Sequence, residues 1–141
     1  MIRQCASAGT YKVEPYKDVS GRNDFLSIKV ARDYRFIYFY AKTRDAIRNF
    51  RDSHCMLLFI NTHQGAGKAW EGYDLVVDAK GTRRTKTSLM RISGSELSSP
   101  VPVPMPVEAN QLTIAIPQAL LEQQRGRISL DFHWADNMAR Y

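Results

Sequence analysis

The chain has 141 residues, of which 44% are hydrophobic and 24% are charged, and its formal net charge is +6. This length predicts one domain with a core of its own. No apolar run approaches the roughly 20 residues of a membrane-spanning helix. The basic residues are interleaved with acids along the chain, so the sequence predicts neither a membrane span nor nucleic-acid binding.

The first residues, "MIRQCASAG", contain no apolar stretch behind their one arginine, so they do not form a signal peptide. Export would depend on a longer parent protein. Cys5 and Cys55 form no metal-ligand motif, and we interpret them as two free thiols. The basic run "KGTRRTK", residues 80–86, is interpreted as a solvated turn between strands rather than a phosphate-binding patch.

Strand-like alternation dominates the chain. Each predicted strand is short, and the intervening segments, such as "SGRND" and "HQGAGK", are rich in turn-forming residues. Together they predict about eight antiparallel strands in an all-β, jelly-roll-like β-sandwich. The predicted strands cover residues 11–15, 26–30, 36–40, 55–60, 73–77, 88–92, 112–116 and 128–134.

Two segments depart from simple alternation. "SSPVPVPMPV" has proline at 100, 102, 104 and 106, which removes a ladder donor at every second residue, so this segment is predicted to be an extended edge or a loop. "PQALLEQQ", residues 117–124, is predicted to be one short helix of one or two turns that links two strands.

No catalytic motif, cofactor motif or metal-binding motif is recognised. "QGAGKAW" lacks the first glycine and the final Ser or Thr of a phosphate loop. His54, His63 and His133 are isolated, and no GxSxG elbow is present. A carboxylate pair for glycoside hydrolysis converges only in the fold, so the sequence leaves that arrangement open. We therefore predict no enzyme activity, no cofactor and no metal.

The distinctive chemistry is the pairing of aromatic and polar side chains. A sugar ring packs its C–H face on an aromatic plane, while its hydroxyls hydrogen-bond to carboxylates and amides. Trp134 continues the inward alternation of "ISLDFHW", which favours a core role, whereas Trp70 lies in a turn between glycines. The candidate ligand contacts are Trp70, Glu71, Tyr73, Trp134, Asp136 and Asn137.

Several segments together resemble a known family. They are "GRNDFLSIKVARD", "FIYFYAKTRD", "MLLFINT", "AWEGYDLVV", "LTIAIPQALL" and "ISLDFHWADN". Over roughly residues 20–137 the chain is similar to β-sandwich accessory domains of bacterial glycoside hydrolases, in particular to family nine carbohydrate-binding modules. The resemblance implies a sandwich without catalysis of its own, attached to a catalytic domain of a parent that is extracellular, periplasmic or on the cell surface. It also implies that two aromatic rings clamp a terminal sugar.

Two departures from this family carry expectations of their own. The strand "MLLFI" is followed by Asn61, Thr62 and His63 instead of an acidic turn, so a calcium site is not expected there. Related domains also continue past "WADN" into a further strand. We therefore expect an unpaired edge near the last strand, and association of two chains in a two-fold dimer through an edge or an apolar face.

The sequence thus favours a non-catalytic carbohydrate-binding accessory domain over residues 1–141. The alternative is a structural or docking β-sandwich without a sugar site. Residues 36–40 and 56–60 support this alternative because they are apolar on both faces, and a second apolar face is usually covered by a partner.

Overall fold

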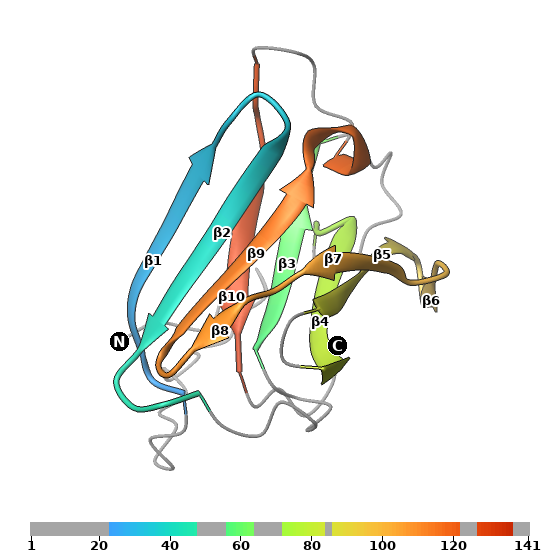
Figure 1. Cartoon of the computed structure of the whole chain (residues 1–141). Coiled ribbons are helices and arrows are strands. Elements are labelled where there is room, and N and C mark those ends of the chain that lie inside the picture. Colours follow the sequence, from blue (N-terminus) through green and yellow to red (C-terminus); the bar gives the residue numbers. More distant parts are fainter. Residues whose placement is uncertain (1–22, 48–55, 64–71, 84–85, 122–126, 137–141) are drawn as a thin grey trace, which may run out of the picture.

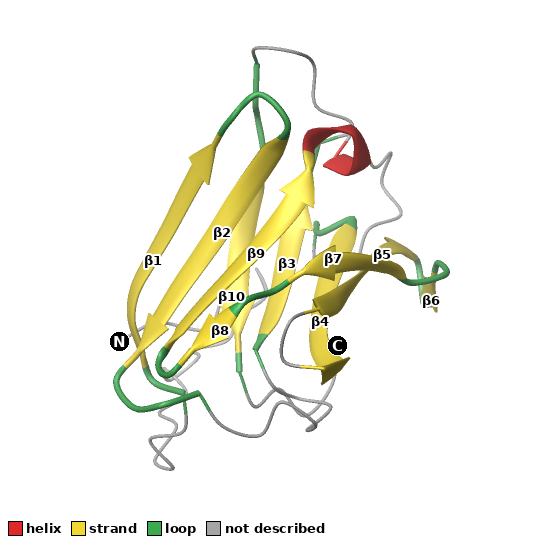
Figure 2. Cartoon of the chain, in the orientation of Figure 1, coloured by secondary structure: helices red, strands yellow, loops and turns green. Residues whose placement is uncertain are grey.

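Two antiparallel sheets pack face to face in the computed structural model (Figures 1 and 2). An all-β sandwich is therefore confirmed. The structure describes residues 23–47, 56–63, 72–83, 86–121 and 127–136. Within those ranges, no helix is long and apolar enough to cross a membrane.

The first sheet has four strands in the order β1-β2-β9-β8, and β2 lies at its centre between β1 and β9. Figure 1 shows β1, β2 and β9 as long neighbouring strands in front of the second sheet. Its strands are β1 (Phe25–Arg32), β2 (Phe36–Thr43), β8 (Val107–Glu108) and β9 (Gln111–Pro117).

The second sheet has the order β10-β3-β4-β5-β6, with β7 also paired to β5. All of its pairings are antiparallel. Its strands are β3 (Leu57–Asn61), β4 (Leu75–Arg83), β5 (Lys86–Ser93), β6 (Glu96–Leu97), β7 (Val101–Pro104) and β10 (Asp131–Ala135).

The core lies between the sheets, and it is built by the alternation of each strand. On β2 the inward side chains Ile37, Phe39 and Ala41 are fully buried, and β9 contributes its even-numbered residues from 112 to 116. The facing sheet contributes, among others, Met56, Leu58, Ile60, Leu75, Val77, Leu89 and Trp134.

Most predicted strands are found near their expected positions. The strand predicted over residues 73–77 is β4, Leu75–Arg83, so residues 80–83, which the sequence predicts to belong to a turn, continue the strand. Residues 128–130 precede the last strand, which begins at Asp131, although Ile128 and Leu130 still pack against the core. The weak strand predicted over residues 11–15 lies outside the described residues.

The proline-rich segment forms an edge strand and then a crossing between the sheets. In the described residues, β7 pairs only with β5. Pro102 and Pro104 have no amide hydrogen to donate, and an edge strand tolerates this because it has no second neighbouring strand to bond. The chain then crosses to β8 on the other sheet (Figure 1). Met105, which lies in this crossing, is buried in the main core. This segment closes one side of the sandwich.

The helix predicted over residues 117–124 is smaller than expected. Pro117 is the last residue of β9, and the helical part is a single 3₁₀ turn, Gln118–Leu121; residues 122–124 lie outside the described residues. The Gln118 amide still donates to the carbonyl of Arg35, at 2.9 Å, so the sheet holds the start of this turn. Leu121 anchors its end in the core.

Strand β3 is buried on both faces. Its residues 58 and 60, with Met56 just before the strand, point into the main core, while Leu57 and Phe59 join a second apolar cluster on the opposite face of the sheet. The other fully buried members of this second cluster are Val76, Ile92 and Ala135. The double-faced apolar pattern of residues 56–60 therefore corresponds to a strand that is covered on both sides.

The two sheets also meet at their other edges. β1 and β10 are terminal strands of their sheets, and the rings of Phe25 and Trp134 lie 6.2 Å apart between them. In the described part of the chain, β10 pairs only with β3. The unpaired edge expected near the last strand and dimerisation through it both stay predictions.

We predict that Trp134→Ala lowers the free energy of unfolding by about 3–5 kcal/mol because it leaves a large cavity in the core. Trp134→Phe should cost less, since it keeps most of the ring volume and removes the indole Nε1 group, which is buried without a hydrogen-bond partner. Urea unfolding of both variants checks this. A Trp134→Ala protein as stable as the parent would contradict the inward assignment.

Candidate functional site

The structure places three of the six predicted contact residues: Tyr73, Trp134 and Asp136. Trp70, Glu71 and Asn137 lie outside the described residues. The three that are placed do not form one site. Tyr73 lies on the outer face of the second sheet, Trp134 points inward from β10, and Asp136 follows the end of β10.

Trp134 is a core residue. Only 2% of its surface is exposed, and its ring packs against Phe25 in a tilted arrangement. A stacking ligand needs an accessible ring face. Because Trp134 has no accessible ring face, it does not contribute to the ligand site proposed below.

Asp136 serves the backbone. Its Oδ1 accepts hydrogen bonds from the amide of Met56, at 2.9 Å, and from Nδ2 of Asn23, at 3.2 Å. Both of these partners have positive φ angles, 49° and 48°. Asp136 therefore ties the starts of β1 and β3 to the end of β10.

Tyr73 is half-buried and belongs to an aromatic group. Its ring lies 5.7 Å from that of Phe59 and 6.4 Å from that of His133. Burial lowers the pKa of His133 below its ordinary value. Tyr73 thus packs over the outer face of β3. Its main role is to shield the Phe59 ring from solvent.

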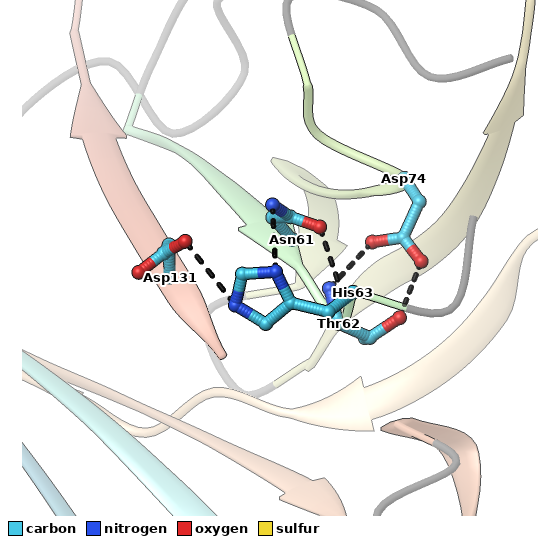
Figure 3. A network of polar contacts seen from close by, with 5 residues as sticks. All are labelled: Asn61, Thr62, His63, Asp74 and Asp131. Atoms are coloured by element: carbon cyan, nitrogen blue, oxygen red, sulfur yellow. Dashed lines mark hydrogen bonds and ion pairs between the residues drawn. The ribbon is translucent and has the colours of Figure 1, made fainter. Parts of the chain in front are cut away.

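A polar network surrounds the end of β3 (Figure 3). Asp74 is buried, and it accepts hydrogen bonds from the amide of Thr62, at 2.8 Å, and from the Thr62 hydroxyl. The guanidinium of Arg91 lies 3.8 Å from the same carboxylate. The carboxylate therefore replaces its lost hydration with charge-assisted partners.

His63 extends this network towards solvent. Its Nε2 lies 3.3 Å from the carboxylate of Asp131, and its Nδ1 lies 3.4 Å from Nδ2 of Asn61. The Thr62 hydroxyl points to Asp74, away from the His63 ring (Figure 3). The network therefore does not place this hydroxyl beside a histidine base, as nucleophilic catalysis requires. Within the described ranges, no group of three or more His, Cys, Asp and Glu side chains could hold a metal ion.

The outer face of the first sheet carries a different feature, a line of aromatic side chains on β2. Phe36, Tyr38 and Tyr40 alternate with the buried residues of the strand, and all three are half-buried. We call these three residues the β2 aromatic row. Neighbouring members are two residues apart, about 6.6 Å along the strand, and the rings of Phe36 and Tyr38 lie 6.0 Å apart with a 40° tilt.

Neighbours of the row are small or polar. Ala31 on β1 and Ala115 on β9 are the register partners of Tyr38, while Lys29 and Thr113 are those of Tyr40. The ammonium of Lys29 lies 5.6 Å from the centre of the Tyr40 ring. The middle ring of the row is therefore flanked by a small side chain on each neighbouring strand.

One end of the row is held by Asp33 in the turn between β1 and β2. Its carboxylate accepts hydrogen bonds from the amides of Arg35, at 2.7 Å, and Phe36, at 2.8 Å, and from the hydroxyl of Tyr38, at 2.6 Å. These donors hold the pKa of Asp33 below its ordinary value, the Tyr38 hydroxyl first among them. The same bond raises the pKa of Tyr38.

The tip of this turn adds a fourth ring. Tyr34 is 83% exposed, and the guanidinium of Arg35 lies 5.8 Å from the centre of its ring. Gln118 steadies the turn through its side-chain amide, which donates to the carbonyl of Asp33 at 2.6 Å. A rigid turn therefore presents a tyrosine and an arginine next to the row.

Sequence reasoning noticed the two apolar faces of residues 36–40 but interpreted them as a docking surface, and it placed the ligand contacts elsewhere. The signal that could have found the row is the type of residue. Its outward positions are aromatic and two of them carry hydroxyls, whereas the inward positions are aliphatic or phenylalanine.

No family model, curated protein or solved structure matches this chain. The resemblance to family nine carbohydrate-binding modules therefore depends on the quoted sequence segments alone.

We predict that Thr62→Val lowers the free energy of unfolding by about 1–3 kcal/mol, because the buried Asp74 carboxylate loses one of its donors. Thr62→Ser, which keeps the hydroxyl, is the matched control and should cost less. Denaturant unfolding of the two variants measures the difference. Equal stabilities would mean that this hydroxyl contributes little.

A second prediction concerns acid stability. Asp33 has a lowered pKa in the folded chain, so its contribution to stability is complete above its unfolded pKa of about 4 and is lost as the pH falls through the lower folded value. Asp33→Asn should therefore show a shallower loss of stability below about pH 4. Urea unfolding between about pH 2 and pH 6 tests this, and an unchanged acid slope would contradict it.

Proposed function

We propose that the chain is a non-catalytic carbohydrate-binding domain whose ligand lies along the β2 aromatic row. The observation that carries this proposal is the line of three half-buried rings on the outer face of the first sheet. A sugar ring has apolar C–H faces and polar edges, so it fits a surface where aromatic rings alternate with hydroxyl groups and small side chains.

The distribution of polar groups supports a sugar in particular. Thr113 lies beside Tyr40, and Gln111 lies beside Lys42 at the same end of the sheet. These side chains offer donors and acceptors to sugar hydroxyls at the edges of the row. The bond between Tyr38 and Asp33 fixes the middle ring of the row before any ligand arrives, which reduces the entropy lost on binding.

In this proposal the domain serves as an accessory unit of a polysaccharide-processing parent outside the cytoplasm. A second candidate function is docking against a neighbouring protein domain. It is favoured by two aliphatic side chains of β1, Leu26 and Val30, which are 55% and 50% exposed. The two functions predict different consequences for substitutions on β2 and β1.

The test is calorimetric titration of the chain with a panel of soluble polysaccharides. For any polysaccharide that binds, Tyr40→Ala should weaken affinity by about 1–3 kcal/mol, as expected for an aromatic contact at the centre of a binding surface. Tyr73→Ala is the matched aromatic control on the other sheet and should leave affinity unchanged. Circular dichroism and melting temperature establish that each variant is folded.

Trp70→Ala completes the series because Trp70 was the strongest ligand candidate in the sequence. If Trp70→Ala or Tyr73→Ala abolishes binding while Tyr40→Ala does not, the sugar site includes the substituted residue and the β2 row is not involved. If no polysaccharide binds and Leu26→Ser or Val30→Ser disrupts association with a partner domain, the docking function replaces the proposal.

A further inference from the structure

The charges around the β2 aromatic row are unevenly distributed along it. Lys29 and Lys42 both flank Tyr40: Lys29 is its partner on β1, and Lys42 lies two residues further along the same face of β2. Glu108 lies on this face beyond Gln111, the β9 partner of Lys42, and the ion pair of Asp24 and Arg44 lies at the same end of the sheet. The opposite end of the row carries Asp33 and Arg35, which have opposite charges.

Asp33 is already engaged by three donors, including the Tyr38 hydroxyl. The two lysines, by contrast, form no ion pair with an acid among the described residues. The ammonium of Lys29 lies over the Tyr40 ring. A ligand that stacks on Tyr40 would therefore displace the Lys29 ammonium from the ring face or use the other face, and in both cases it would lie next to Lys29 and close to Lys42.

We infer that the sugar bound at Tyr40 carries a carboxylate, so that the ligand is a single chain of an acidic polysaccharide. This inference rests on the proposed carbohydrate-binding function. A carboxylate would accept charge-assisted hydrogen bonds from the two ammonium groups while its ring covers the aromatic face. A neutral sugar would offer these two ammonium groups only uncharged hydrogen-bond acceptors.

The geometry of the rings favours one chain over a crystalline surface. Phe36 and Tyr38 are tilted by 40° relative to each other, so they do not form a flat platform. Successive sugars of a separate chain can rotate to follow such rings. The row spans about 13 Å from residue 36 to residue 40.

The same distribution argues against a nucleic acid as the ligand. Proteins that bind single strands place cations along the whole path of the phosphate backbone. Here the two lysines gather at one end, and Asp33 lies at the other. Such an arrangement recognises one acidic group at a defined position.

Calorimetric titration can test this inference with matched pairs of polysaccharides: polygalacturonate, alginate and hyaluronate, each beside its carboxyl-reduced neutral form, in about 0.15 M salt to screen distant charges. At least one acidic form should bind about tenfold more tightly than its reduced form. Lys29→Gln and Lys42→Gln should each weaken binding of the acidic form about three- to tenfold, and by a larger factor than they weaken binding of the reduced form. Lys86→Gln, an exposed lysine of β5 in the other sheet, is the matched charge control and should change neither.

The remaining outcomes separately contradict the acidic ligand, the location of the site or the proposed function. If acidic and reduced forms bind equally, and Tyr40→Ala weakens both, the carbohydrate site stands and the carboxylate is wrong. If Lys86→Gln weakens acidic binding as much as Lys29→Gln, the preference reflects net charge and not this site. If neither form of any pair binds, both the inference and the proposed function fail. Tighter binding of an oligothymidylate would identify a nucleic-acid surface instead.

Discussion

The pairing of β2 with β1 on one side and β9 on the other is the constraint on which the rest of the structure depends. This register directs Ile37, Phe39 and Ala41 into the core and leaves the β2 aromatic row outside. A slip of one residue would exchange the two faces along the whole strand. The core and the proposed binding surface are therefore two consequences of the same backbone pairing.

Two strands with the same kind of sequence have different surroundings. β2 and β3 are both apolar on both faces, yet β3 is buried on both sides, whereas the outward side chains of β2 are half-buried. The difference follows from what lies on each outer face. Phe59 of β3 packs beneath Tyr73, while the outward rings of β2 have alanine, threonine and lysine as their neighbours in the sheet.

Carboxylates at the strand ends hold this arrangement in place. Asp33, Asp74 and Asp136 each accept a hydrogen bond from at least one backbone amide at a turn or strand end. An ionised acceptor makes such bonds stronger than a neutral one does. Asp33 matters most for the proposed function, because it links the rigidity of the turn to the position of Tyr38 in the row.

The sequence by itself determined the alternation, excluded the proline-rich segment from a central strand and favoured an inward Trp134, because a period of two and the missing amide of proline are local properties. Only the tertiary structure decided which apolar face is covered, since this depends on segments distant in the chain. It also separated Tyr73, Trp134 and Asp136, which lie on opposite faces and at a strand end. Lys29 and Tyr40 meet only because β1 pairs with β2 in one register, and residue types alone do not encode that pairing.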